Sequence, residues 1–365
     1  FATGEGAVAI LYGDTPLLRP QTVRRLTDAV AGGAGLAVLG FRPADPAQYG
    51  RLVTDASGRL LRIVEHADAS PAERAIGLCN SGVLAFSAAL GRRLLPAITD
   101  SNAKREFYLT DLAALAAEAG HPATIIEAED AADVLGVNSQ ADLAAAEGAF
   151  QSRMRAAAMA SGVTLIDPAT VWFSYDTRLG RDVTVGPNVV FGPGVSVADG
   201  VEIRPFSHLE GASIGSGATI GPFARLRPGA ELGPDVHIGN FVEIKKARID
   251  AGAKVNHLTY IGDAEIGART NIGAGTITCN YDGFDKNRTI IGADAFIGSD
   301  TLLIAPVTLG DGAYTGSGTV VTRDVPADTL VVTRPELTSV PGWPGRFKAR
   351  KAREKAARAN PSKGE

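Results

Sequence analysis

Large apolar residues recur every six positions through the second half of the chain. The series covers 179–209, 214–244, 249–272 and 291–321, with one-residue slips between the first stretches, one further slip within the third, and a polar interruption before the last. A period of six fits neither an α-helix nor a coiled coil. Three hexapeptides instead make one triangular coil of a parallel β-helix, in which one large apolar side chain per short strand points inward.

The glycine content supports this interpretation. Glycine accounts for 43 of 365 residues and often follows the periodic apolar residue, where small residues can turn the corners of a coil. Successive coils are expected to stack about 4.8 Å apart.

The first half of the chain has a different pattern, typical of an α/β domain. The run 7–11 predicts a buried strand that ends near Asp14, which makes Asp14 either a metal ligand or an ordinary turn residue. An alanine-rich stretch that begins at Ser139 predicts a linker helix. We therefore expect a first domain at 1–138, a linker helix at 139–162, a β-helix at 163–335 and a basic, solvated tail at 336–365.

Composition and charge narrow the function only slightly. The formal charge of −4 offers no global field that would attract nucleic acid, and no apolar run is long enough to span a bilayer. Cys79 and Cys279 are too few for a disulfide framework, so we expect two reduced thiols and a cytoplasmic protein. The chain begins with Phe1, which suggests that its front has been removed.

Two cations in the periodic region are separated by one full coil. Arg227 and Lys245 each follow an inward residue and lie 18 positions apart in one unbroken phase, so they should stack on one face. Like charges in that position favour a bound anion such as a phosphate. Alternatively, they are solvated cations screened by neighbours such as Glu243.

Other polar residues of the repeat are candidates for chemistry. His257 lies two positions after an inward residue and should be exposed, where an imidazole can accept a proton from an amine near neutral pH. His208 and His237 do not share its position in the coil, which argues against a histidine zinc site. The polar run 278–288 should project as a loop, either as a binding element or as a tolerated insertion.

Five blocks together resemble one family: GPFARLRPGAEL from Gly221, NFVEIKKA from Asn240, NHLTYIGDAEIG from Asn256, NIGAGTITCNYDG from Asn271 and FIGSDTLLIAPVTLG from Phe296. The family is the bacterial bifunctional N-acetylglucosamine-1-phosphate uridyltransferase/glucosamine-1-phosphate acetyltransferase. The resemblance implies a left-handed β-helix, a homotrimer with sites between neighbouring solenoids, and acetyl-CoA as co-substrate.

The resemblance also assigns roles to individual residues. His257 would be the general base that frees the amine of glucosamine-1-phosphate for direct attack on the thioester. The sugar phosphate would be bound or positioned by Arg227, Lys245, Tyr260, Asn271, Asn280, Tyr281 and Lys286. The acetyl-CoA positions would be Ala274, Ser299, Ser317 and Arg334, with the Ser299 hydroxyl near the developing oxyanion.

For the first domain, the resemblance implies a partial Rossmann-like nucleotidyltransferase. Asp14 and Asn138 would hold Mg²⁺ against the phosphates of UTP, and the pocket for nucleotide and UDP-N-acetylglucosamine would be lined by Tyr12, Gly50, Glu65 and Asn80. The family's glycine-rich, basic βα turn has no match in the 365 residues, so we expect no uridylyl transfer by this chain. A non-catalytic β-helix scaffold is the competing interpretation.

Overall fold

The computed structural model describes residues 4–46, 48–102, 105–334 and 336–359. The chain divides into two compact units, residues 1–156 and 157–365. No helix in the described ranges combines the length and apolarity needed to cross a bilayer.

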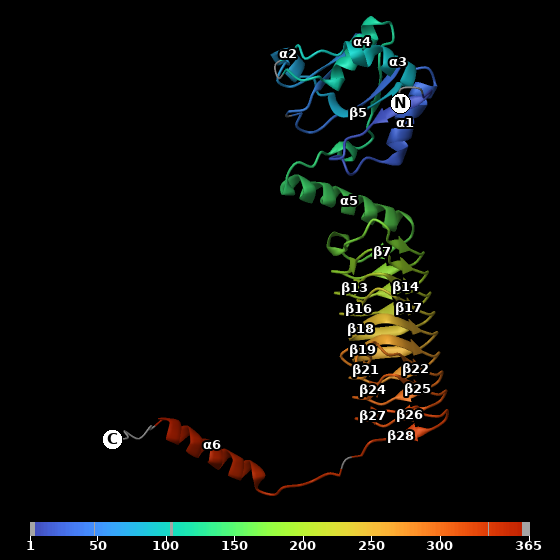
Figure 1. Ribbon diagram of the computed structural model, residues 1–365, viewed down its shortest axis with the longest axis vertical. Helices are drawn as coiled ribbons and strands as arrows, with labels where there is room; N and C mark the ends of the chain where they lie inside the picture. Colours follow the sequence, from blue (N-terminus) through green and yellow to red (C-terminus); the bar gives the residue numbers. More distant parts are fainter. Residues whose placement is uncertain (1–3, 47, 103–104, 335, 360–365) are drawn as a thin grey trace. The chain divides into compact units, whose positions relative to one another are not determined.

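The first unit is a mixed β-sheet between two helical layers (Figure 1). Its strands are β1 (Ala7–Ile10), β2 (Leu36–Phe41), β3 (Arg51–Thr54), β4 (Leu60–Val64), β5 (Cys79–Ser87) and β6 (Thr124–Glu127). The order is β4-β3-β5-β2-β6, with β1 also paired to β5. The helices are α1 (Pro20–Ala31), α2 (Pro71–Arg74), α3 (Ala88–Leu94) and α4 (Leu112–Glu118), with short 3-10 turns at Leu95–Ala97, Leu109–Asp111 and Ala131–Val134.

Successive side chains of the central strands point to opposite faces of the sheet, and each face has its own hydrophobic core. Leu36 and Val38 of β2 join a cluster with α3 and α4 on one face of the sheet, while Ala37 and Leu39 join α1 on the other. The run 7–11 forms a strand, but it is not buried as expected. Strand β1 is antiparallel to β5, and its residues are at most half-buried.

Helix α5 (Gln140–Ala160) forms where the sequence predicts a linker helix. Ser139 begins it, because its hydroxyl accepts a hydrogen bond from the Asp142 amide at 3.2 Å. The chain leaves the helix at Gly162, whose φ of +98° suits a glycine.

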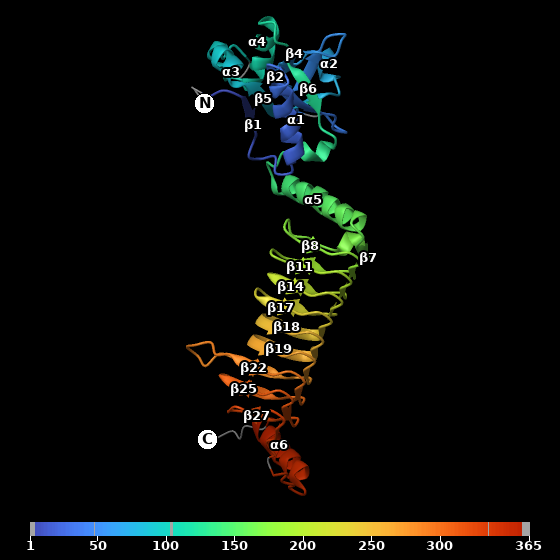
Figure 2. The same cartoon turned by 90° about the vertical axis from the view of Figure 1, so that its right-hand side faces the viewer.

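The second unit is a left-handed parallel β-helix (Figures 1 and 2). Short strands stack in three columns, which we call faces A, B and C. Strands β18 (His237–Ile249) and β19 (Lys254–Ile266) run through all three faces. The insertion at 280–288 is the loop beside β22 in Figure 2.

The remaining strands belong to one face each. Face A contains β10 (Val190–Phe191), β13 (His208–Leu209), β16 (Arg225–Leu226), β21 (Ile277–Cys279), β24 (Leu302–Ile304) and β27 (Val320–Val321). Face B contains β8 (Arg178–Leu179), β11 (Ser196–Val197), β14 (Ala212–Ile214), β17 (Ala230–Leu232), β22 (Thr289–Ile291) and β25 (Val307–Leu309). Face C contains β7 (Thr164–Leu165), β9 (Thr184–Val185), β12 (Glu202–Ile203), β15 (Thr219–Ile220), β20 (Asn271–Ile272), β23 (Phe296–Ile297), β26 (Tyr314–Thr315) and β28 (Leu330–Val331).

The hexapeptide prediction for the interior is confirmed. All the predicted inward positions are buried except Leu179, which is half-buried on an early coil. Each buried Ile, Leu or Val contributes about 1.5–3 kcal/mol to folding. Coil partners lie 18 residues apart where the phase is unbroken, as in Leu226 and Ile244, and 17 apart where it slips, as in Ile244 and Ile261.

The basic tail expected at 336–365 includes a helix. Residues Trp343–Ala359 form helix α6, which follows the last coil strand, β28. The second unit also has a 3-10 turn near its start, at Pro168–Thr170. Alanine and long basic residues favour a helix intrinsically, and Glu354 pairs with Lys351 at 2.8 Å. The side chains described in this helix are mostly exposed.

Candidate functional site

His257 lies at the corner between faces C and A. It is exposed, and it is paired in register with Asn240 on the preceding coil. The imidazole Nδ1 lies 2.9 Å from Asn240 Oδ1. An amide oxygen only accepts hydrogen bonds, so Nδ1 carries the proton and Nε2 presents a lone pair to solvent. Neighbouring coils therefore set the imidazole in the tautomer that can accept a proton.

The four predicted coenzyme positions gather below this histidine. Strand register places Ala274, Ser299 and Ser317 on successive coils in the same corner position as His257. Arg334 joins them, because its guanidinium lies about 3.3 Å from where a side chain on Gly316 would begin. We call these four residues, together with His257, the corner column. Between His257 and Arg334 the column contains only small side chains.

Arg227 and Lys245 stack on face A, one coil apart, as their spacing predicts. Each also has an acidic partner: Arg227 Nη1 lies 2.7 Å from Glu243 Oε1, and Lys245 Nζ lies 3.7 Å from Asp263 Oδ2. The hydrogen bond to Glu243 raises the pKa of Arg227. The screening by neighbours that the sequence left open is therefore present, and it includes Asp263.

The loop at 280–288 adds a third cation to this group. Lys286 lies beside Lys245, and the closeness of the two ammonium groups lowers the pKa of Lys286. The buried Asn280 donates to Asp263 Oδ2 at 2.5 Å. The two bridging residues of the loop are Tyr281 and Lys286, with the Tyr281 hydroxyl donating to the Gly283 carbonyl at 2.6 Å.

Three cations thus meet two carboxylates at one edge of face A. We call Arg227, Lys245 and Lys286 with Glu243 and Asp263 the cation cluster. It keeps an excess positive charge, which suits an anion with more than one oxygen.

Tyr260 and Asn271 lie on different faces. Tyr260 is paired with Glu243 on face A, and its phenol covers Gly262, where an added Cβ would lie 2.3 Å from the hydroxyl oxygen. Asn271 lies on face C, in register with Lys254 and Phe296. The structure therefore brings Tyr260 to the cation cluster and leaves Asn271 around the corner.

In the first unit, Tyr12, Asp14 and Asn138 line one cavity of about 350 Å³. The Val137 amide donates to the Asp14 carbonyl at 2.8 Å and so holds the two segments together. Asp142 also lines the cavity, and hydrogen bonds from the Ser139 hydroxyl and the Asn138 amide lower its pKa.

The other predicted residues of this unit meet nearby in the sheet. The Asn80 amide donates to the Gly50 carbonyl at 2.8 Å, and an added Cβ on Gly50 would lie 3.3 Å from Glu65 Oε2. Gly50 thus leaves room for the Glu65 carboxylate, which also accepts a hydrogen bond from Thr110 at 3.2 Å.

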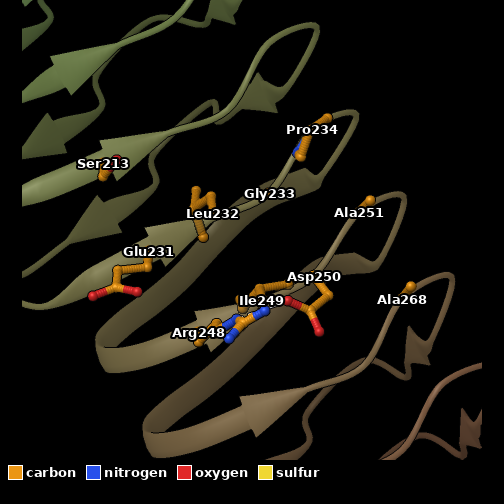
Figure 3. A pocket seen from close by; sticks show the side chains of 10 residues that line it. All are labelled: Ser213, Glu231, Leu232, Gly233, Pro234, Arg248, Ile249, Asp250, Ala251 and Ala268. Atoms are coloured by element: carbon orange, nitrogen blue, oxygen red, sulfur yellow. Dashed lines mark hydrogen bonds and ion pairs between the residues drawn. The ribbon is translucent and has the colours of Figure 1, made fainter.

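Face B carries a separate groove of about 650 Å³ (Figure 3). Its charged residues are Glu231, Arg248 and Asp250, and the Arg248 guanidinium is paired with Asp250 at 2.9 Å. None of the residues predicted from the sequence lines it. Sequence reasoning did miss Asn240 and Asp263, although each lies one coil from a predicted residue, at the 17- or 18-residue spacing.

Comparison with known proteins agrees with this architecture. The family described as bacterial transferase hexapeptide (six repeats) matches residues 176–211, 211–246 and 288–323. The chain is 66% identical to the bifunctional protein GlmU of Maricaulis maris over 96% of this chain and 77% of that protein. It is 58% identical to the GlmU of Paracoccus denitrificans over 93% of this chain and 75% of that protein. The chain belongs to the GlmU family.

A GlmU relative from Paramagnetospirillum magneticum is 53% identical over 96% of this chain and 78% of its own length. A solved UDP-N-acetylglucosamine acyltransferase of Francisella novicida covers 52% of this chain and 78% of its own at 16% identity, with a TM-score of 0.29, which is too low to carry an argument. As a member of the GlmU family, the chain is a hexapeptide-repeat transferase.

Proposed function

We propose that this chain transfers the acetyl group of acetyl-CoA to the amine of glucosamine-1-phosphate. The observation that carries the proposal is the cation cluster, in which Arg227 and Lys245 stack on successive coils and Lys286 lies beside Lys245. Such a cluster suits a sugar phosphate. The nearby corner supplies a histidine with a free Nε2, which a passive scaffold does not require.

His257 acts as the general base. The amine of the sugar attacks the thioester carbonyl as its proton passes to Nε2, while Asn240 holds the Nδ1 proton and keeps the ring oriented. A C–N bond forms, the C–S bond breaks, and the imidazolium returns the proton to the departing thiolate. No covalent enzyme intermediate is needed, so positioning and proton transfer supply the catalysis.

Acetyl-CoA lies along the corner column. Ala274 and the two serines below it leave open space for a chain that runs parallel to the solenoid axis, with the thioester beside His257. Arg334 at the lower end binds the coenzyme phosphates, and the Ser299 hydroxyl lies near the developing oxyanion.

The complete site requires a second copy of the chain, in a homotrimer. Asn271 on face C and Lys245 on face A cannot both contact one sugar phosphate bound to a single solenoid, because the corner lies between them. A neighbouring solenoid that presents face C to the cation cluster would bring them together.

An exposed apolar ladder supports this assembly. Phe206, Phe223 and Phe241 stack on successive coils with ring centroids 5.0 and 5.1 Å apart, and Leu258 follows. All four are 45–64% exposed and have positive φ. Left-handed backbone at a bulky residue costs about 1–3 kcal/mol, and burial against a neighbour would offset it.

In the first unit, Asp14 and Asn138 supply oxygen ligands of the kind that Mg²⁺ prefers, and the Asp142 carboxylate lies in the same cavity. These residues would hold Mg²⁺ against the phosphates of UTP. Uridylyl transfer also needs a phosphate-gripping turn, which the printed sequence lacks, so we propose that these 365 residues do not catalyse it.

A thiol-release assay with acetyl-CoA and glucosamine-1-phosphate tests the main proposal. The chain should release CoA only when both substrates are present, and His257→Ala should abolish release while the trimer persists in sedimentation analysis. If the unaltered chain assembles but releases no thiol, the scaffold interpretation is correct. A parallel assay with UTP, N-acetylglucosamine-1-phosphate and Mg²⁺ should show no pyrophosphate.

A further inference from the structure

Two aromatic rings stack on the outside of face C, below Asn271. The ring centroids of Phe296 and Tyr314 lie 5.2 Å apart with an interplanar angle of 19°, and the residues are 42% and 50% exposed. Leu330 continues the same outward column. Aromatic rings exposed in this way are costly in water unless another surface covers them.

The composition of this column changes at a particular coil. In the coils above, its outward residues are polar: Thr219, His237, Lys254 and Asn271. From Phe296 downward they are apolar. A solvated face has no reason to change in this way.

The neighbouring corner changes at the same level. The apolar ladder ends at Leu258, and the next position in that column is Gly275. Beneath His257 the corner column contains only Ala274, Ser299 and Ser317 before Arg334 is reached. The bulk lost at the corner is thus replaced by aromatic bulk on face C, so the small corner residues lie beside an apolar surface.

We propose that Phe296 and Tyr314 form the apolar wall against which the pantetheine arm of acetyl-CoA lies. The proposal rests on the acetyl-transfer function above. Phe296 precedes Ser299 by three residues, and Tyr314 precedes Ser317 by three. At most about 10 Å of extended chain therefore separates each ring residue from the corner column. Tyr314 lies three coils below His257, about 14 Å along the axis, which an extended pantetheine chain can span.

The ring orientation selects the pantetheine arm rather than the adenine. The two rings stack with centroids 5.2 Å apart, so each turns one face toward the other and the space between them is too narrow for a planar base. A flat base would need an open ring face. The methyl groups and methylenes of pantetheine need only apolar contact along the edges.

Three acetyl donors of different length test this assignment on the full chain. Acetyl-CoA and S-acetyl-pantetheine both contain the arm, whereas S-acetyl-N-acetylcysteamine lacks most of it. The double variant F296S/Y314S should raise KM about tenfold for the two longer donors and less than about twofold for the shortest. The single variant Phe296→Leu should keep KM close to that of the unaltered chain, because leucine preserves an apolar wall.

Ile290→Ala is the matched control, since Ile290 is an exposed apolar residue that points outward from face B. An effect limited to acetyl-CoA would place the nucleotide on the rings and overturn the proposal. An equal effect on all three donors, or loss of the trimer in sedimentation analysis, would show that the rings support the fold or the interface instead.

Direct binding separates this inference from the proposed function. Calorimetry with CoA should show weaker binding by the double variant. If the unaltered chain binds CoA but does not acetylate glucosamine-1-phosphate, the proposed function fails and the wall stands. If it does not bind CoA, both fail.

Discussion

Asn240 and His257 stand on successive coils, with Asn240 Oδ1 2.9 Å from the imidazole Nδ1. Their separation of 17 residues reflects a slip in the hexapeptide phase between the two coils. The contact fixes the tautomer of the only histidine at this corner position in the described solenoid, and we expect Asn240 to position its imidazole.

The first prediction concerns this pair. His257→Ala should lower kcat by about 10²–10⁴-fold, because general-base catalysis is lost. Asn240→Leu should lower kcat less, with an unchanged KM for both substrates. Asn240→Asp should move the acid limb of the pH–rate profile to higher pH, because the carboxylate favours the imidazolium. Steady-state kinetics across pH provide the measurement.

His237→Ala is the control for these variants, since His237 is exposed on face C and does not lie at the corner. If Asn240→Asp leaves the pH profile in place, the asparagine does not act through the imidazole.

The second prediction tests the cation cluster. Lys245→Ala or Arg227→Ala should raise KM for glucosamine-1-phosphate about 10- to 100-fold, since each removes a charge-assisted contact. Any turnover of unphosphorylated glucosamine should change little. Arg248→Ala is the matched control, because Arg248 is paired with Asp250 on face B (Figure 3) and neither residue belongs to the cation cluster. Equal losses for both sugars would mean that the cations do not bind phosphate.

The third prediction is a pH dependence of substrate affinity. Lys245 lowers the pKa of Lys286 below the ordinary 10.5, so Lys286 loses its positive charge at lower pH than an isolated lysine does. KM for the sugar phosphate should therefore rise on the alkaline side before ordinary lysines titrate. Lys286→Arg should flatten this rise, because a guanidinium keeps its charge there. A profile shared by both proteins would exclude Lys286 as the titrating group.

The repeat makes some contacts of the solenoid predictable from the sequence alone. In a solenoid, contacts between coils depend on counting, so the interior positions and the stacking of Arg227 on Lys245 follow from an unbroken period. The Lys245–Asp263 pair does not follow from strand register, because the slip makes Gly262 the register partner of Lys245 and the carboxylate of the next residue reaches the ammonium group. In the α/β unit the strand order depends on long-range pairing, and no repeat reveals it. Strand β1, expected to be buried, lies beside β5 with its residues at most half-buried.

Helix α6 shows what composition leaves open. A basic composition with few apolar residues predicts a solvated tail, and alanine, lysine and arginine are strong helix formers that allow such a tail to be helical. Local propensity there is independent of whether the segment packs against anything.

The last prediction uses backbone conformation to separate folding from assembly. Phe223 and Phe241 have φ of +56° and +54°, which glycine adopts without strain. The double variant F223G/F241G should therefore unfold at a temperature close to that of the unaltered chain when both are monomeric, yet lose the trimer in sedimentation equilibrium and lose acetyl transfer with it. Asn188→Gly is the control, since Asn188 also has φ of +56° in the described solenoid but lies above the ladder. A trimer that survives removal of both rings would show that the neighbouring chain packs elsewhere, and the two-face argument for Asn271 and Lys245 would then need a different partner surface.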